Sequence, residues 1–344
     1  MTDDERFLRA YNTLSPKARK LYRDLGDALA VIPAHQGKLV EKTSLPRSVV
    51  AQVLPFVEVW GGPGDRGLDE KLTADGEPAV HLIIPDAHFS RKDRMNNFAR
   101  ARRLGDYAAL VAKKCAAKDR RLRIVCLGDW WDMFSLCYYE KGKVGITQES
   151  VKEDLDTGYL ALALFREALD RHQDVEPDNI DFHFLEGNHE ERLVKARETA
   201  EYAPLLNHLP SHRTLAEGCG WKYHEYMVPA NIDGVAYAHC FPSGVMGRAI
   251  GGTAAAKTLL DKMMVSCVAG HSHVYDMMLR TDAFGGKRFA LVAGCYYDRI
   301  PSYAKATGPM WWRGVTILNG VREGCLERGH AAVTVEDMIE AVGY

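Results

Sequence analysis

Three short apolar runs that end in polar side chains alternate with long stretches of helical spacing, and this alternation restricts the fold more than any other feature. The runs are AVHLIIPD (79–86), RLRIVCLGD (121–129) and NIDFHFLEGN (179–188). Helical spacing covers 93–118 and 149–172 between them. Buried strands that alternate with helices are typical of an α/β domain, in which ligands bind beyond the carboxyl ends of the strands.

The second half of the chain contains further short strands with little helix between them. They are GVAYAHC, VSCVAGHSH, RFALVAGCYYD and RGVTILN, and one helical stretch covers about 245–264. This pattern predicts that mostly antiparallel strands continue the sheet. Near the C-terminus, TVEDMIEAVGY predicts a closing helix.

Each of five strand ends in succession supplies side chains that can bind a metal. In chain order these are Asp86 and His88, then Asp129, then Asn188 and His189, then His239, then His271 and His273. One histidine alone is more often structural, and the two in GHSH could be ordinary neighbours on one face of a strand. Five ends in succession favour a metal site instead. Imidazole, carboxylate and amide ligands suit ions such as Mn²⁺, Fe²⁺ or Zn²⁺.

In this order, the blocks DAH, GDWWD, GNHE, AHC and GHSH resemble the signature of the calcineurin-like metallophosphoesterases. The resemblance covers roughly 79–319, and SGVMGRAIGG, VAGCYYD and MWWRG look like the phage-encoded branch of that family. It implies a metallophosphoesterase domain at 76–320 with a four-layer α/β/β/α sandwich, followed by a C-terminal extension at 321–344.

The resemblance also implies a centre of two divalent metal ions. One ion would bind Asp86, His88, Asp129 and His273, and the other would bind Asp129, Asn188, His239 and His271. A bridging Asp129 could hold the ions ~3.5–4 Å apart, and water between them would lose a proton near neutral pH and attack phosphorus. Mn²⁺ is favoured, with Fe²⁺, Zn²⁺ or Ni²⁺ as alternatives, and Gly270 would give the backbone room beside the ions.

Two further residues would act beside the metals. His189 resembles the family histidine that binds the phosphate and protonates the leaving oxygen as a general acid. Asp132 would orient His189 and support a metal ligand, although a cap at a strand-to-helix junction explains Asp132 equally well. Arg192 could contact a substrate phosphate, but an exposed helix face is the simpler interpretation of it.

The expected reaction is hydrolysis of phosphodiester bonds, with DNA as the favoured substrate. The block GDWWDMF lacks the Arg-Gly of the protein serine/threonine phosphatases in the same superfamily, which argues against a phosphoprotein substrate. Two alternatives stay open. One is a phosphatase or phosphodiesterase of nucleotides or other small phosphoesters, and the other is a DNA-binding adaptor whose metal site is inactive.

The first sixty residues predict a small all-α domain, joined to the rest by a linker at 61–75. The segment LVEKTSLPRSVVAQVLPFV has the spacing of a helix-turn-helix and looks like bacterial winged-helix repressors at its turn. Residues 1–60 contain nine Lys or Arg against seven Asp or Glu, so their net charge is only slightly positive. Contact with DNA and docking to a protein are equally good interpretations of this segment.

Aromatic and basic side chains near the blocks allow two interpretations each. The aromatic residues could form core or a stacking platform for a nucleobase, and they are Trp130, Trp131, Phe134, Tyr138, Tyr139, Trp311 and Trp312. The basic residues could bind a phosphate-bearing chain or form a solvated helix face, and they are Arg91, Lys92, Arg94, Arg100, Arg102 and Arg103.

Composition restricts the partners and the compartment. A net charge of −2 gives no overall basic signature, so any affinity for nucleic acid must be local. No run approaches the ~18 apolar residues of a membrane span, and the acidic N-terminus is unlike a secretory signal. Eight cysteines without a C-x-x-C pair predict reduced thiols. We therefore expect a cytoplasmic protein, in the host cytoplasm if phage-encoded, and the sequence does not indicate its oligomeric state.

Overall fold

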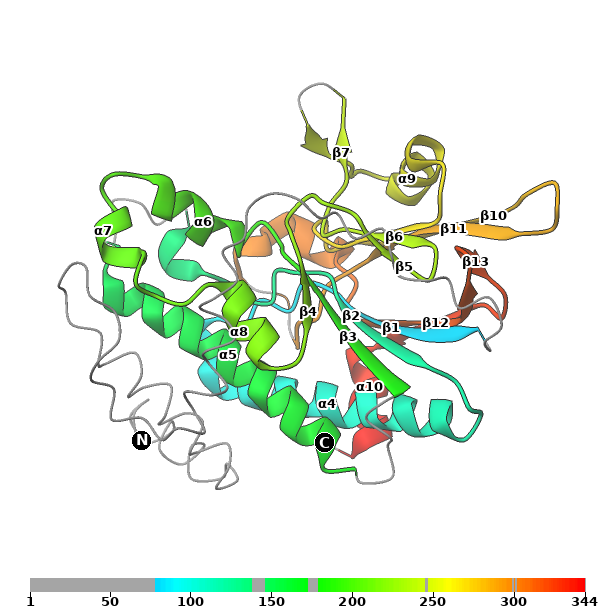
Figure 1. Ribbon diagram of the computed structural model, residues 1–344, viewed down its shortest axis with the longest axis horizontal. Helices are drawn as coiled ribbons and strands as arrows, with labels where there is room; N and C mark the ends of the chain where they lie inside the picture. Colours follow the sequence, from blue (N-terminus) through cyan, green and yellow to red (C-terminus); the bar gives the residue numbers. More distant parts are fainter. Residues whose placement is uncertain are drawn as a thin grey trace, which may run out of the picture.

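The computed structural model describes residues 78–137, 146–172, 179–244, 247–298, 300 and 302–343. The predicted helix-turn-helix domain at 1–60 and the linker at 61–75 lie outside the described residues. Tyr138 and Tyr139 lie outside them too. The described part is mixed α/β, as the alternation of strands and helices predicts (Figure 1).

A seven-stranded sheet contains the three strands predicted from the first apolar runs. Its order is β13-β12-β1-β2-β3-β4, and β14 also pairs with β12. The strands are β1 (Ala79–Ile84), β2 (Leu122–Cys126), β3 (Ile180–Leu185), β4 (Lys222–His224), β12 (Gly314–Arg322), β13 (Cys325–Leu326) and β14 (His330–Thr334). Strands β1 to β4 are parallel to one another, whereas β12 runs antiparallel to β1. The carboxyl ends of β1, β2 and β3 therefore meet at one edge.

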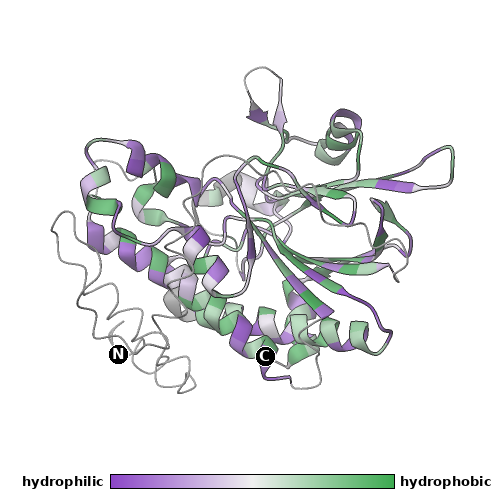
Figure 2. Ribbon diagram, in the orientation of Figure 1, coloured by the Kyte–Doolittle hydropathy of each residue, from purple (hydrophilic) through white to green (hydrophobic). Residues whose placement is uncertain are grey.

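Helices cover one face of this large sheet. They include α4 (Arg94–Ala116), α5 (Gln148–Asp170), α8 (His212–Gly218) and α10 (Val335–Val342). Helix α6 (Glu191–Glu198) packs on α7 (Ala203–Leu206), and α7 packs on α5. Leu82 and Ile124 of the sheet share a buried core with Phe165 of α5. Thr147 begins α5, because its side chain accepts a hydrogen bond from Ser150 N. Figure 2 shows mostly hydrophobic strands in the large sheet and mixed faces on α4 and α5.

A second, five-stranded sheet packs on the other face. Its order is β10-β11-β9-β6-β5, and its strands are β5 (Ala230–Ile232), β6 (Val235–Tyr237), β9 (Cys267–Ala269), β10 (Tyr275–Thr281) and β11 (Lys287–Ala293). The prediction that the later strands continue the first sheet is wrong for GVAYAHC, VSCVAGHSH and RFALVAGCYYD, which correspond to β6, β9 and β11. Their predicted antiparallel order is wrong too, because these three strands are parallel. The prediction is confirmed for RGVTILN, most of which lies in β12 and runs antiparallel to β1. Buried residues on both faces of β9 and β11 require a layer on each side. On the inner side, Val268 and Leu291 pack with Ile83 of the large sheet.

The outer face of the small sheet is covered by α9 (Ala255–Met263), whose Leu259 shares a buried cluster with Val292. This helix is shorter than the predicted stretch at 245–264. The short strands β7 (Pro242–Ser243) and β8 (Arg248–Ala249) pair ahead of it. Gly251 and Gly252 then separate β8 from the helix, because glycine disfavours helix.

The C-terminal residues belong to the large sheet and its helix layer. The predicted boundary at residue 320 falls inside β12, in which Val321 pairs with Ala79. Strand β14 pairs with β12, and the predicted closing helix is α10, which contacts α4. Within the described part of the chain, no helix has both the length and the apolar character needed to span a membrane.

Candidate metal centre

All five predicted blocks lie directly after strands. Asp86 and His88 follow β1, Asp129 follows β2, and Asn188 follows β3 in the large sheet; His239 follows β6, and His271 with His273 follows β9 in the small sheet. The two sheets therefore bring the predicted ligands to one place from opposite sides. The atoms fall into two groups that meet at Asp129.

The first group contains Asp86, His88 and His273. His88 Nε2 lies 3.2 Å from His273 Nε2 and 3.6 Å from Asp129 Oδ2. His273 Nε2 lies 3.5 Å from Asp86 Oδ1. Ligands that bind one ion at ~2.0–2.2 Å lie about 3 Å or slightly more from one another, so this spacing fits a metal ion.

The second group contains Asn188, His239 and His271. Asn188 Oδ1 lies 2.9 Å from His239 Nε2 and 2.8 Å from His271 Nδ1, and these two nitrogens are 3.2 Å apart. Asp129 Oδ2 lies 3.5 Å from His239 Nε2. The same oxygen therefore faces both groups, while Asp129 Oδ1 accepts a hydrogen bond from His189 N at 2.9 Å. The two histidines of GHSH lie in different groups, as the resemblance implies.

Four of the predicted ligands have left-handed backbone conformations. The φ angles are 45° for His88, 49° for Asp129, 71° for His271 and 59° for His273. This conformation costs about 1–2 kcal/mol for a residue with a Cβ. Such strain collects at functional sites, where the surrounding structure holds it. The ends of the strands are therefore shaped to aim side chains, and His271 and His273 are not ordinary strand neighbours.

Two glycines let the backbone approach the carboxylates. A Cβ on Gly270 would lie 2.2 Å from Asp86 Oδ2, and a Cβ on Gly187 would lie 2.2 Å from Asp129 Oδ1. Any side chain at these positions would displace a predicted ligand. The predicted role of Gly270, which is to leave room for the backbone, fits this close approach.

The carboxylates of the site are buried and could bind a cation. Asp86 is 0% exposed and Asp129 2% exposed, and among the described residues their ion-pair partners are histidines rather than Lys or Arg. Burial alone would raise the pKa of Asp129, but His189, His239 and His88 outweigh it and hold this pKa below its usual range. Two buried carboxylates need compensating charge, and cations between the groups would supply it.

The two buried imidazoles differ in their protonation. Burial lowers the pKa of His88 to about 4, so its ring is neutral at pH 7. Burial would also lower the pKa of His239, but Asp129 and Asp86 outweigh it and raise this pKa. His239 Nδ1–H donates to the carbonyl of Leu127 at 2.9 Å, so its Nε2 faces Asn188 and Asp129, where a metal ion would replace the proton. The donor set of neutral imidazole, carboxylate and amide oxygen fits a borderline divalent ion.

His189 lies beside the two groups. Its Nδ1–H donates to the carbonyl of Asp132 at 2.7 Å, and its Nε2 lies 3.7 Å from Asp129 Oδ2. Arg192 donates to His189 Nε2 at 2.7 Å and to the Asp132 carbonyl at 3.0 Å, so it faces the site rather than solvent. Burial would lower the pKa of His189, but Asp129 and Asp132 outweigh it and raise this pKa.

The carboxylate of Asp132 lies between two rings, 3.5 Å from His189 Nδ1 and 3.6 Å from His88 Nδ1. The short helix that follows, Phe134–Leu136, has Met133 at its N-cap and no side-chain cap. The geometry therefore matches an orienting role for Asp132, and the alternative of a helix cap is not observed.

The sequence interpretation missed Glu190, which is 0% exposed beneath the site. Its Oε2 accepts hydrogen bonds from Asp129 N and Gly187 N, and its Oε1 accepts one from Trp131 N, each at 2.9 Å. Glu190 therefore joins the loops after β2 and β3. The only sequence signal is its place in the GNHE block, because a Glu at the start of a helix normally faces solvent.

The aromatic residues divide between core and site. Trp130 and Trp131 are fully buried, and their ring N–H groups donate to carbonyls of α5. Trp311 instead meets the ring of His273 at the centre, with 4.2 Å between centroids. The core interpretation is therefore confirmed for Trp130 and Trp131, whereas a stacking role for Trp311 beside the site stays a prediction.

The basic residues after the first block are partly structural. Arg100 is buried and donates to the carbonyls of Ala87 and Tyr296, and Arg103 is buried and pairs with Asp298. For these two, neither the phosphate nor the solvated interpretation is right. They hold the loop after β11 against α4.

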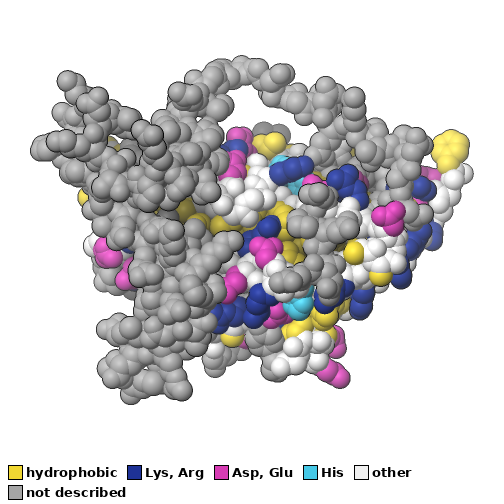
Figure 3. All heavy atoms as spheres, turned by 60° about the horizontal axis from the view of Figure 1, so that its bottom comes forward, with side chains coloured by type: hydrophobic (Ala, Val, Ile, Leu, Met, Phe, Trp, Pro, Cys, Tyr) yellow, Lys and Arg dark blue, Asp and Glu magenta, His cyan; other side chains and the backbone are white. Residues whose placement is uncertain are grey.

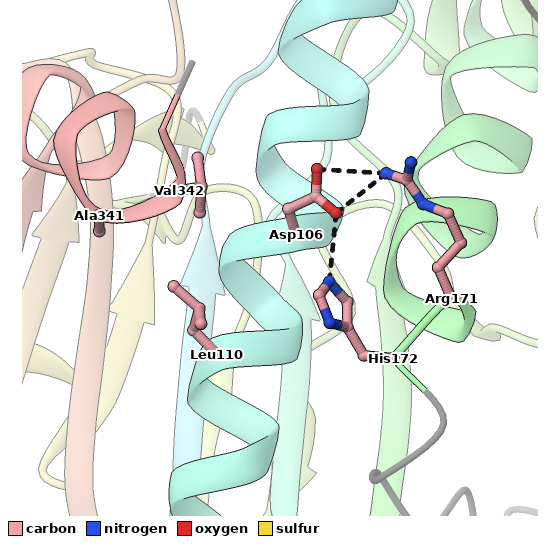
Figure 4. Close-up of a pocket in the computed structure, with 6 residues that line it drawn as sticks. All are labelled: Asp106, Leu110, Arg171, His172, Ala341 and Val342. Carbon is pink, nitrogen blue, oxygen red and sulfur yellow. Dashed lines mark hydrogen bonds and ion pairs between the residues drawn. The ribbon is translucent and has the colours of Figure 1, made fainter.

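A cavity of about 440 Å³ contains none of the predicted site residues. Figure 4 shows the residues that line it between α4, the end of α5 and α10: Asp106, Leu110, Arg171, His172, Ala341 and Val342. Asp106 accepts hydrogen bonds from Arg171 at 3.0 and 3.2 Å and lies 3.3 Å from His172 Nε2. Its charged groups satisfy one another, so the strand-end cluster is the better candidate site.

Comparisons with known proteins add no identification. No protein-family model matches the chain, and no curated protein matches it.

Proposed function

We propose that this chain is a metal-dependent phosphoesterase with two divalent ions, and that it hydrolyses phosphodiester bonds in nucleic acid. The observation that carries the proposal is the pair of ligand groups that share Asp129 Oδ2. A structural metal site would need one group, whereas two adjacent ions that share a carboxylate are typical of hydrolases of phosphate esters.

Each of the two ions would have its own set of ligands. Asp86, His88 and His273 would hold one ion, Asn188, His239 and His271 would hold the other, and Asp129 would contact both. When bound, the ions would stabilise charge on phosphoryl oxygens and supply a nucleophile from water. Mn²⁺ is the favoured ion, with Fe²⁺, Zn²⁺ and Ni²⁺ as alternatives.

His189 would act as the general acid. Because its Nδ1–H is held by the Asp132 carbonyl, a second proton on the ring sits on Nε2. That atom faces the centre, and from there it could pass the proton to the leaving oxygen. Arg192 now donates to the same atom. We propose that a substrate oxygen replaces His189 Nε2 as its partner.

The order of the packed layers supports a calcineurin-like fold. Helices α4 and α5, the large sheet, the small sheet and α9 follow one another through three buried clusters. This succession supports the proposal of a four-layer α/β/β/α sandwich, which is the fold that the resemblance implies.

Nucleic acid is the proposed substrate. Over the described part of the face in Figure 3, Lys and Arg side chains lie among Asp and Glu side chains rather than in one basic patch. We expect the described residues to bind nucleic acid mainly through the centre and its surroundings.

A substrate panel tests the proposal. The purified protein would be stripped of metal, reloaded with Mn²⁺ and given bis-(p-nitrophenyl) phosphate, p-nitrophenyl phosphate, and labelled single- and double-stranded DNA. We expect close to two ions per chain and faster turnover of the diester than of the monoester, together with cleavage of DNA.

Asp129→Asn is the control, because it keeps the shape of the side chain and removes the shared charge. This variant should lose both ions and the diesterase activity. A strong preference for monoesters would favour a small-molecule phosphatase. Full metal loading without hydrolysis of any phosphoester would contradict the proposed activity.

A further inference from the structure

Two aromatic rings form a corner beside the group that contains His88 and His273. The ring of Tyr297 stacks on His88, with centroids 5.4 Å apart and planes at 19°. The ring of Trp311 meets His273 at 90°, with centroids 4.2 Å apart. The rings of Tyr297 and Trp311 are 5.9 Å apart. A flat group bound at the centre would therefore have aromatic surface on this side.

The two rings differ in exposure. Tyr297 is 9% exposed, and the guanidinium of the buried Arg100 lies 5.4 Å from its ring. Trp311 is partly exposed, and Met310 before it is 63% exposed. Tyr297 is therefore the inner wall of the corner, and Trp311 is its more exposed ring.

The backbone fixes Trp311 next to the centre. Trp311 N donates to the carbonyl of Gly308, and Trp312 N donates to that of His273, each at 3.0 Å. Trp312 itself packs on Tyr275, with ring centroids 4.6 Å apart. Because these bonds hold the backbone at Trp311 and Trp312, we expect that a ligand at Trp311 would order little of the protein.

We propose that Trp311 is the stacking surface for a nucleobase next to the scissile phosphate, so that the enzyme takes nucleotides whose base is unstacked. This inference rests on the proposed function and narrows its substrate. In a duplex both faces of a base are covered by its neighbours, so only a single strand, a frayed end or an extruded nucleotide can present a face to Trp311.

The test compares two single-stranded oligonucleotides with the Mn²⁺-loaded protein. One contains only thymidine, and the other has the same length with abasic residues around the cleaved position. Stacking on an aromatic side chain is worth about 1–3 kcal/mol per base, so Trp311→Leu should lower kcat/KM for the first oligonucleotide by about 5- to 150-fold. Trp311→Leu should cleave the abasic oligonucleotide at nearly the wild-type rate. On the thymidine oligonucleotide, Trp311→Phe should keep much of the activity that Trp311→Leu loses.

Three controls separate stacking from packing. Phe284→Leu removes a fully exposed aromatic ring at the turn between β10 and β11, and it should leave kcat/KM unchanged for both oligonucleotides. The number of ions per chain and the inhibition by inorganic phosphate, which has no ring, should be the same in Trp311→Leu as in wild type. Equal loss on both oligonucleotides, or weaker metal binding, would mean that Trp311 only supports His273 and would overturn the inference.

The proposed function can fail separately. If the wild type cleaves bis-(p-nitrophenyl) phosphate but neither oligonucleotide, the phosphoesterase stands and the nucleobase site is refuted. If the protein binds no metal and cleaves no diester, both proposals are refuted.

Discussion

Replacing Gly270 by alanine should weaken the metal group that contains Asp86 and leave the fold in place. A Cβ at this position would lie 2.2 Å from Asp86 Oδ2. The φ of Gly270 is not among the positive values, so alanine strains no torsion there. The cost of the change is therefore the contact with the carboxylate.

The size of the effect follows from the bonds that Asp86 makes. Its two oxygens accept a hydrogen bond from His271 N at 3.0 and 3.1 Å, and turning the carboxylate away would break it. A hydrogen bond to a charged group contributes about 1.5–3 kcal/mol, so the free energy of unfolding of the metal-free protein should fall by this amount. Because Asp86 would also lose its place as a ligand, affinity for one ion should fall at least by about 10–100-fold.

Urea unfolding of the metal-free protein and titration with Mn²⁺ against a chelating dye would measure both quantities. Gly218→Ala is the matched control, because a Cβ at this last residue of α8 would have no heavy atom within 4 Å. We expect the control to bind metal as wild type does. If Gly270→Ala bound both ions with wild-type affinity, the placement of Asp86 at the centre would be wrong.

Three further predictions follow from the site and the core. Chelation should lower the melting temperature, since each ion present at 100 times its dissociation constant stabilises the fold by about 2.7 kcal/mol; a melting curve unmoved by EDTA in the metal-loaded protein would argue against the centre. Glu190→Gln should cost about 1–3 kcal/mol in urea unfolding, because the amide cannot accept all three backbone N–H groups that the carboxylate accepts. His212 is buried, and burial lowers its pKa from 6.5 to about 3. Between pH 6.5 and pH 3, this histidine is protonated in the unfolded chain but neutral in the folded protein. The free energy of unfolding should therefore fall as the pH drops below 6.5, and at pH 5 it should be lower by about 2 kcal/mol. His212→Phe should remove that part of the decline, and an identical decline in the variant would show that His212 does not cause it.

Strands β1, β2 and β3, which position the site, were predictable from the sequence because each apolar run ends directly in polar residues. The runs before Asp86, Asp129 and Asn188 are buried on both faces, as a central parallel strand requires. Since parallel neighbours end at one edge, the convergence of their side chains followed from the order of the blocks. The small sheet was not predictable, because a short apolar strand does not indicate which sheet it joins.

Charged residues in the interior were the least predictable part of the site. Arg100 and Glu190 carry charges that normally face solvent, and only the carbonyls and N–H groups around them explain their burial. The left-handed backbone conformation of His271 and His273 could not be predicted from the sequence either. It depends on how β9 ends against the large sheet, and local sequence carries no sign of that contact.

Each ligand group draws side chains from both sheets: Asp86 and His88 of one group follow the large sheet, while His273 follows the small one. The width of the centre is consequently set by the thickness of the apolar layer where Ile83 and Val125 meet Val268. A substitution that adds or removes a methylene there would change the distance between the two sheets. It would therefore change the size of the ion that the proposed centre can bind, although no ligand residue is altered.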